Sequence, residues 1–286
     1  MAIYKRGYER YQGPLTGHWT RLLVLPRFAW RRLFQQRLVL ILLIASLIWP
    51  LLCGLFVYLS NRLDLLQSLP GDFKNMLDIN GSFFLVFMNV QAVFSVLLAA
   101  LAGPGLIAPD LANNALPLYF SRPLTRFDYV AARMAALVGL LSLVTWLPGV
   151  LLFWMQAGMA GWTWFTKNWY LGAGIFCGFA AWILVVSLVA LACSAYVKWR
   201  IVAGGLVLGF FFLLTGAAQM VNVVLRVGWG SLLNPARSMY IIWSALLGVP
   251  PPPGPGVWDC VFMLAGMAVV LGLILERKLR AVEVIS

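Results

Sequence analysis

The chain has 286 residues, of which 62% are hydrophobic and only 10% are charged. Soluble domains carry about 25% charged residues, so this composition excludes an ordinary soluble protein and indicates a chain that crosses a membrane several times. The formal net charge of +12 would suggest nucleic acid as the partner of a soluble protein, but in a membrane protein basic residues gather on the cytoplasmic side of the spans. We therefore expect membrane lipid, and no nucleic acid, as a partner.

Stretches without Asp, Glu, Lys or Arg locate the membrane spans. A helix needs about 20 mostly apolar residues to cross the hydrocarbon core, and the chain offers several stretches of this kind. The fold class that we expect is an all-α polytopic membrane protein with six transmembrane helices. Their expected positions are residues 38–59, 81–105, 129–153, 170–196, 201–225 and 257–276.

The spans divide the chain into three parts and place both termini on one side of the membrane. We expect a cytoplasmic tail and interfacial helix over residues 1–37, a six-helix transmembrane domain over 38–276, and a cytoplasmic tail over 277–286. Most of the 21 lysines and arginines fall on the side of the termini. This bias predicts cytoplasmic termini, in a multi-pass protein of a bacterial or archaeal cytoplasmic (inner) membrane.

The segment before the first span has the pattern of a basic amphipathic helix. Between Trp19 and Arg37, tryptophans and leucines alternate with arginines at roughly helical spacing. A helix of this kind lies along the lipid headgroups. Pro26 is expected to kink or split it, because proline removes a backbone donor and clashes with the preceding turn.

The stretch between the second and third spans, residues 103–129, is too polar and too rich in proline to lie in lipid. Pro109 suits the first turn of a helix, and Asp110 suits the positive end of that helix. Pro117 is expected to end the helix, and residues 125–128 form a capping-box pattern that opens the next one. The chain is therefore predicted to leave the membrane, form one short rigid helix and re-enter, which suits a docking surface for a soluble partner.

Two further connections are predicted on the opposite side of the membrane. Residues 155–169 are expected to form an outside turn whose tryptophans lie at the membrane interface. In the segment 226–256, a short helix is expected near 236–247 after Asn234 and Pro235. The apolar run 239–249 is too short to span, so this part should be interfacial or re-entrant.

Two spans carry polar side chains that are costly in lipid unless they find partners or face a cavity. One interpretation is that these residues line a substrate pathway, and the other is that they form ordinary hydrogen bonds between helices. Both interpretations stay open at this point. The residues are Asn89, Gln91 and Ser95 in the second span and Thr215, Gln219 and Asn222 in the fifth.

Glycines recur in the fourth and fifth spans at spacings that let helices approach closely. Gly174 and Gly178 have the small-xxx-small spacing, and Gly205 and Gly209 repeat it in the next span. We expect these positions to serve helix packing.

The loop between the second and third spans resembles that of ABC-2 type transporter permeases. The resemblance rests on Asp110 at the family's acidic position, on the run Ser-Arg-Pro-Leu-Thr-Arg at residues 121–126, and on Arg133 where the family usually has lysine. The chain departs from the family at residues 113–115, where Asn-Asn-Ala replaces a Gly-Thr pair, and at Pro117, where an acidic residue is common. The order of spans also matches, including an elbow helix before the first span and short external helices between the fifth and sixth.

The resemblance implies a transport machine with a separate motor. A P-loop ATPase subunit would dock on the 109–128 loop, with ATP and Mg bound to that subunit and no cofactor bound by this chain. A second permease copy or a homologous permease would complete a dimer, in which the second and fifth spans of both subunits face a central pathway. The residues implied in ATPase coupling are Asp110, Asn113, Asn114, Arg122 and Arg126.

The chain lacks the residues that other chemistries need. It has no P-loop motif for ATP, a single histidine, no metal-site spacing and no paired carboxylates inside a span. We therefore expect no enzyme in this chain, and a proton-coupled carrier is disfavoured because it needs ionisable groups in the spans. The leading hypothesis is an exporter subunit for an amphipathic or lipid-like substrate. The alternative is a non-transporting membrane anchor or assembly subunit of a larger complex.

Overall fold

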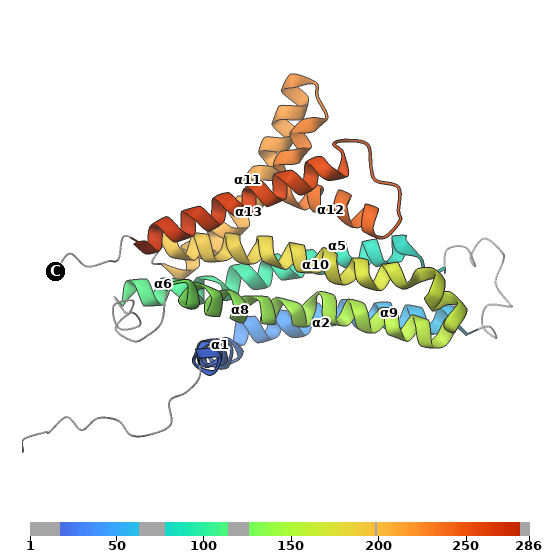
Figure 1. Cartoon of the computed structure of the whole chain (residues 1–286), viewed down its shortest axis with the longest axis horizontal. Helices are drawn as coiled ribbons and strands as arrows, with labels where there is room; N and C mark the ends of the chain where they lie inside the picture. Colours follow the sequence, from blue (N-terminus) through green and yellow to red (C-terminus); the bar gives the residue numbers. More distant parts are fainter. Residues whose placement is uncertain (1–17, 63–77, 114–125, 198, 281–286) are drawn as a thin grey trace, which may run out of the picture.

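The computed structural model describes residues 18–62, 78–113, 126–197 and 199–280, and within these ranges every element is a helix (Figure 1). Six helical segments are long and apolar enough to cross a membrane. This confirms an all-α, multi-pass membrane protein with six candidate spans. The segments are Arg37–Ser60, Gly81–Asp110, Phe127–Ala160, Trp162–Tyr196, Arg200–Leu225 and Val257–Lys278.

The first two helices are α1 (His18–Phe34) and α2 (Arg37–Ser60), and α2 confirms the first predicted span. Of the two expectations for Pro26, a kink or a split, the split is wrong, because α1 continues through it as one helix. Packing on a neighbouring helix supports α1 along its length. The Trp30 indole donates from Nε1 to the carbonyl of Ala136 at 2.7 Å, and its ring fills the space where a Cβ at Gly139 would lie.

The second span is broken rather than straight. Helix α5 (Gly81–Ala102) gives way at Gly103 to α6 (Pro104–Ala112). The prediction that a helix starts at Pro109 is therefore wrong, since α6 begins at Pro104 and Pro109 lies inside it. At this junction a Cβ at Gly103 would lie 2.7 Å from the Cβ of Ala190, so only glycine allows α10 to approach this closely.

The third and fourth spans are joined by a single residue. Helices α8 (Arg126–Val144) and α9 (Trp146–Ala160) form the third span, and α10 (Trp162–Tyr196) forms the fourth. The predicted outside turn over 155–169 is wrong, because both helices continue through it. Gly161, at φ 88°, turns the chain between them in a backbone region that favours glycine.

The last part of the chain contains two spans and a short helix between them. Helix α11 (Arg200–Leu225) is followed by the 3-10 helix η1 (Trp229–Leu233), by α12 (Pro235–Leu246) and by α13 (Val257–Arg280). The Asn234 side chain caps α12, accepting from the backbone N–H of Ala236 at 3.0 Å and of Arg237 at 3.2 Å. With 12 residues, α12 is too short to span, as the sequence predicts.

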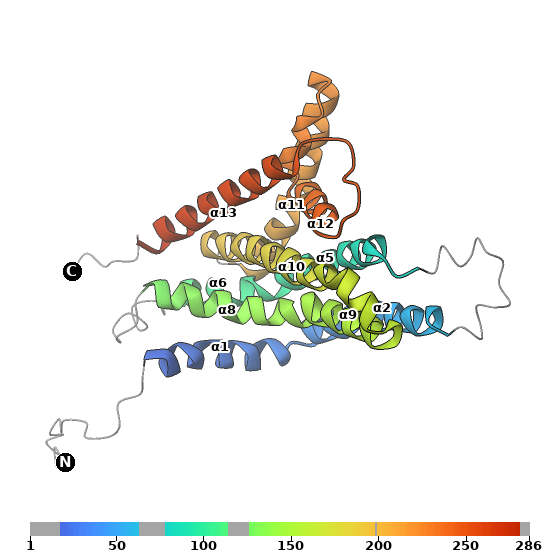
Figure 2. The same ribbon diagram turned by 45° about the vertical axis from the view of Figure 1, so that its right-hand side comes forward.

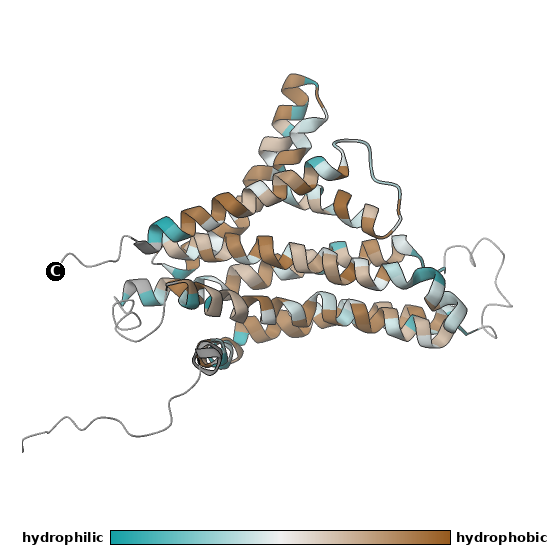
Figure 3. Ribbon diagram, in the orientation of Figure 1, coloured by the Kyte–Doolittle hydropathy of each residue, from teal (hydrophilic) through white to brown (hydrophobic). Residues whose placement is uncertain are grey.

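Helix α10 lies at the centre of the bundle, and α11 and α13 lie at its edge. Of the most apolar window of each span, 67% is buried inside the chain for α10 but only 22% for α11 and 17% for α13. Figures 1 and 2 show α11 leaning away from the other spans, so that its far half projects from the bundle. Figure 3 shows that this projecting part is largely hydrophobic, as are the middles of the other spans.

Basic residues gather at one end of the bundle, where α2, α8 and α11 each begin with an arginine. We call it the basic end: it holds the start of α2, α8 and α11 and the end of α6, α10 and α13 (Figure 1). The Lys278 ammonium lies 5.1 Å from the centre of the Tyr196 ring, which joins the ends of α13 and α10 there. At the opposite end, Asn61 Nδ2 donates to Gln156 Oε1 at 2.6 Å and joins the end of α2 to α9.

Candidate functional site: the α6–α8 corner

Helix α6 is held at the basic end by a hydroxyl group from α10. The Ala108 N–H donates to the Ser194 hydroxyl oxygen at 3.0 Å, and that hydroxyl donates to the Pro104 carbonyl at 3.3 Å. Ser194 therefore ties the turn of α6 that precedes Pro109 to α10.

A second attachment joins α6 to α8 through three side chains. Asp110 Oδ2 accepts a hydrogen bond from the Tyr129 hydroxyl at 2.8 Å and forms an ion pair with the Arg133 guanidinium. The Arg133 guanidinium carbon also lies 5.2 Å from the centre of the Tyr129 ring. Both charged side chains are only about one-tenth exposed, at 12% and 11%, and Tyr129 is fully buried.

The burial of this corner makes it a rigid element. Removing one partner from a buried ion pair leaves an uncompensated charge, at a cost of about 3–5 kcal/mol. Asp110 is thus part of the internal attachment of α6 to α8, with only a small fraction of its surface open to a partner. This arrangement fixes Asn113 and Arg126, the described residues that flank the segment 114–125.

The other residues predicted for ATPase coupling fall at or beyond the edge of the described ranges. Asn114 and Arg122 lie outside them. Asn113 is exposed, in the turn that ends α6, where its N–H donates to the Pro109 carbonyl at 3.0 Å. Arg126 is the first residue of α8, and the following residue, Phe127, is 80% exposed. Phe127 was not among the predicted site residues, although it directly follows the Ser-Arg-Pro-Leu-Thr-Arg run.

The polar residues of α5 separate into two environments. Gln91 and Ser95 are fully buried: Gln91 Nε2 donates to the Ser46 carbonyl of α2 at 3.0 Å, and the Trp182 indole of α10 donates to the Ser95 hydroxyl at 2.8 Å. These contacts match the interpretation as interhelical hydrogen bonds. Asn89 is exposed.

The polar residues of α11 do not join those of α5 on one surface. Gln219 is exposed, whereas Thr215 donates to the Phe211 carbonyl of its own helix at 2.8 Å. Asn222 is half-buried, and its Oδ1 atom is buried next to Gly230, with no hydrogen bond to a described residue. Within one chain, therefore, the six candidate pathway residues do not form a continuous polar lining.

The four predicted packing glycines also divide into two pairs. A Cβ at Gly174 would lie 3.0 Å from the Leu246 carbonyl oxygen, and one at Gly178 would lie 2.7 Å from Trp243 Cδ1, so both let α12 approach α10. Gly205 and Gly209 have no neighbouring atom within 4 Å of such a Cβ. The glycine of α11 that packs inside the chain is instead Gly204, which faces the Ala100 carbonyl oxygen at 2.6 Å.

Metal chemistry finds no support in the described residues, which contain no group of three or more His, Cys, Asp or Glu side chains that could hold an ion. The contacts at the α6–α8 corner tie one short helix to two spans. No protein-family model matches the sequence, and no curated protein matches it.

Proposed function

We propose that the chain is the transmembrane permease subunit of an ABC-2 type transporter, an exporter of an amphipathic or lipid-like substrate. The observation that carries this proposal is the doubly attached α6 helix, tied by Ser194 to α10 and by Asp110 to α8. A helix held in this way next to the Ser-Arg-Pro-Leu-Thr-Arg run suits the transfer of force from a docked protein to the spans.

The motor is a separate P-loop ATPase that docks on the 109–128 loop. It binds ATP and Mg, and this chain performs no hydrolysis itself. Closure of two ATPase subunits pushes the loop, and α6 passes the displacement to α8 and α10. Asn113, Asn114, Arg122 and Arg126 are proposed as contacts to the ATPase, whereas Asp110 acts mainly by positioning the loop.

The orientation follows from charge. The basic end faces the cytoplasm, since basic residues favour that side, so both termini and the coupling loop are cytoplasmic. The chain then lies in a bacterial or archaeal cytoplasmic (inner) membrane, with α1 along the headgroups as an elbow helix. On the outside, α12 forms the short external helix between the last two spans.

The transporter is a dimer with a second copy or a homologous permease. Helix α11 supports this proposal, because Gly205 and Gly209 leave one stretch of it open and large apolar side chains on its far half, such as Phe212 and Val223, are about three-quarters exposed, at 76% each. A two-fold interface presents the same patch from both chains. Asn89 and Gln219, which are exposed in one chain, would line the pathway between the two.

The test is purification of the tagged full-length chain from its own membranes, followed by assay of Mg-dependent ATP hydrolysis. The proposal predicts that a P-loop protein co-purifies and hydrolyses ATP, and that Arg122→Glu removes both the protein and the activity. A wild-type complex without a P-loop protein would contradict it. A chain that keeps its ATPase after Arg122→Glu would contradict the docking surface.

A non-transporting membrane anchor is the second candidate, and one observation favours it. Gln91 and Ser95 are used for internal hydrogen bonds, so α5 offers little polar surface to a substrate. The two functions differ in the role of Gln219. In a transporter, Gln219→Leu changes the ATPase activity stimulated by substrate, whereas in an anchor it leaves that activity unchanged.

A further inference from the structure

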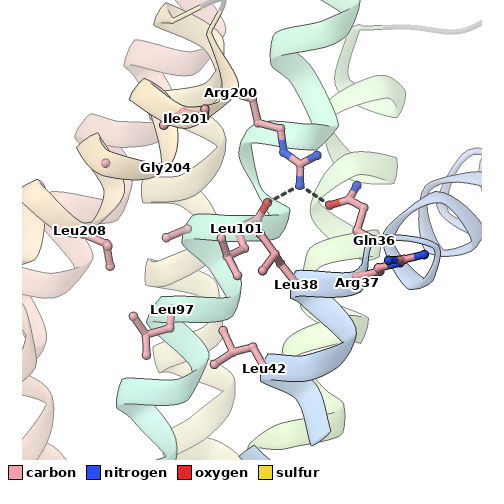
Figure 4. Close-up of a pocket in the computed structure, with 12 residues that line it drawn as sticks. Gln36, Arg37, Leu38, Leu42, Leu97, Leu101, Arg200, Ile201, Gly204 and Leu208 are labelled. Atoms are coloured by element: carbon pink, nitrogen blue, oxygen red, sulfur yellow. Dashed lines mark hydrogen bonds between the residues drawn. The ribbon is translucent and has the colours of Figure 1, made fainter. Parts of the chain in front are cut away.

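A cavity of about 900 Å³ opens at the basic end between α2, α5 and α11 (Figure 4). Apart from three polar residues, its lining is made of leucine, isoleucine, alanine and glycine. The polar residues, Gln36, Arg37 and Arg200, all lie where α2 and α11 begin. The cavity therefore has a polar mouth at the membrane surface and an apolar interior.

The cavity follows the spans toward the middle of the membrane. Along α11 its lining runs from Arg200 to Leu208, which at 1.5 Å per residue is about 12 Å. Half of the hydrocarbon core is about 15 Å thick. The apolar part thus has the length and the direction of an acyl chain in the leaflet at the basic end.

Arg200 supplies hydrogen-bond donors and a positive charge at the mouth of the cavity. One of its nitrogens, Nη2, donates both to Gln36 Oε1 and to the Leu101 carbonyl, the latter at 3.1 Å. Its Nε and Nη1 atoms make no hydrogen bond to a described residue. Figure 4 shows the guanidinium held between Gln36 and Leu101 at the mouth, while the Arg37 side chain extends away from the cavity.

The charge at the mouth has no counter-charge among the lining residues, none of which is acidic. Arg32 adds a second positive charge that acts on Arg200. An arginine fork with unused donors suits a phosphate group, and basic side chains at the membrane surface attract anionic lipids.

We propose that this cavity binds one anionic glycerophospholipid of the leaflet at the basic end. Its phosphate contacts Nε and Nη1 of Arg200, and one acyl chain lies along Leu38, Leu97 and Leu208. The proposal rests on the six spans and on the cavity, and not on the transport function proposed above.

The experiment is native mass spectrometry of the purified full-length chain in detergent, titrated separately with phosphatidylglycerol and phosphatidylcholine. We expect one tightly bound phosphatidylglycerol and about fivefold weaker binding of phosphatidylcholine, the contribution of one basic residue near a membrane surface. Arg200→Gln should remove the preference for phosphatidylglycerol, and Arg200→Lys should restore most of it.

A second pair of variants tests the acyl-chain part independently of Arg200. Gly205 lines the cavity, and a Cβ there would have no atom of the chain within 4 Å. Gly205→Phe should therefore fill part of the cavity and weaken the binding of both lipids at least tenfold. Gly266→Phe on α13, where a Cβ would also have no atom within 4 Å and which does not line the cavity, should leave binding unchanged.

Three results would overturn the proposal. Equal binding of the two lipids by the wild type, or lipid binding that survives Gly205→Phe, would exclude this site. A wild-type chain that binds no lipid and forms a dimer that Gly205→Phe dissociates would show that a second copy of the chain covers the cavity instead.

Discussion

Asp110, near the end of α6, and Arg133, in the second turn of α8, form a largely buried ion pair that joins the two sides of the 114–125 segment. Asp110→Ala should lower the free energy of unfolding by about 3–5 kcal/mol, because it removes one partner of a largely buried ion pair. Unfolding of the purified protein in detergent measures the effect.

Charge-preserving variants provide the control for this pair. Arg133→Lys keeps the positive charge and should lower the free energy of unfolding by less than Asp110→Ala does. The double variant with Asp110→Arg and Arg133→Asp, which exchanges the two charges, should be more stable than Asp110→Ala. If Asp110→Ala is as stable as the wild type, the ion pair does not hold α6 in place.

Ser194→Ala should destabilise the chain by about 1–3 kcal/mol, since it removes the hydroxyl that bridges Ala108 and Pro104 and leaves buried polar groups unpaired. The matched control is Ser187→Ala on the same helix, where the buried hydroxyl has no hydrogen-bond partner among the described residues. That change should be nearly neutral. Equal effects of the two substitutions in the same unfolding assay would show that the bridge contributes nothing.

Gly174→Ala should loosen α12 from α10, because its Cβ would lie 3.0 Å from the backbone carbonyl oxygen of Leu246 and a backbone atom cannot move aside cheaply. Gly209→Ala, with open space around its Cβ, should be neutral or stabilising by up to about 1 kcal/mol from helix propensity. Thermal unfolding of both variants measures the difference. The account of α12 fails if Gly174→Ala is the more stable protein.

The proposed orientation predicts which thiols react from outside the cell. In a variant lacking the four native cysteines, Asn113→Cys should be protected from a membrane-impermeant maleimide in intact cells. Gly228→Cys, in the exposed connection between α11 and η1, should be labelled. Labelling of Asn113→Cys alone would indicate the opposite orientation in the membrane, and labelling of both would contradict the six-span arrangement.

The spans could be predicted from the sequence because each depends on a local property, namely a long apolar run between charged residues. The bounds of α2 and α12 agree with the predictions to within one residue. The errors arose where tertiary contacts decide the backbone. Pro109 lies inside α6, whose preceding turn is bonded to Ser194, 85 positions away, and the 155–169 turn is absent because Gly161 alone reverses the chain.

In the candidate site, too, the sequence predicted local features but not the tertiary contacts. Asp110 was predicted to matter from its position in a motif, but its pairing with Tyr129 and Arg133 depends on how α6 packs on α8. Nor could the sequence distinguish Gly204, which packs inside the chain, from Gly205, which does not. Neighbouring residues on a helix point in directions about 100° apart, and only the packed structure shows which direction faces a partner.

The most direct test of the central claim is a photo-crosslinking amino acid placed at Asn113, in the chain expressed at its natural level in its own cells. We predict that illumination joins this position to a P-loop ATPase, and that the same amino acid at Gly228, between α11 and η1, does not. A crosslink to the ATPase from Gly228 but not from Asn113, or from neither position in a complex that hydrolyses ATP, would contradict docking at the α6–α8 corner.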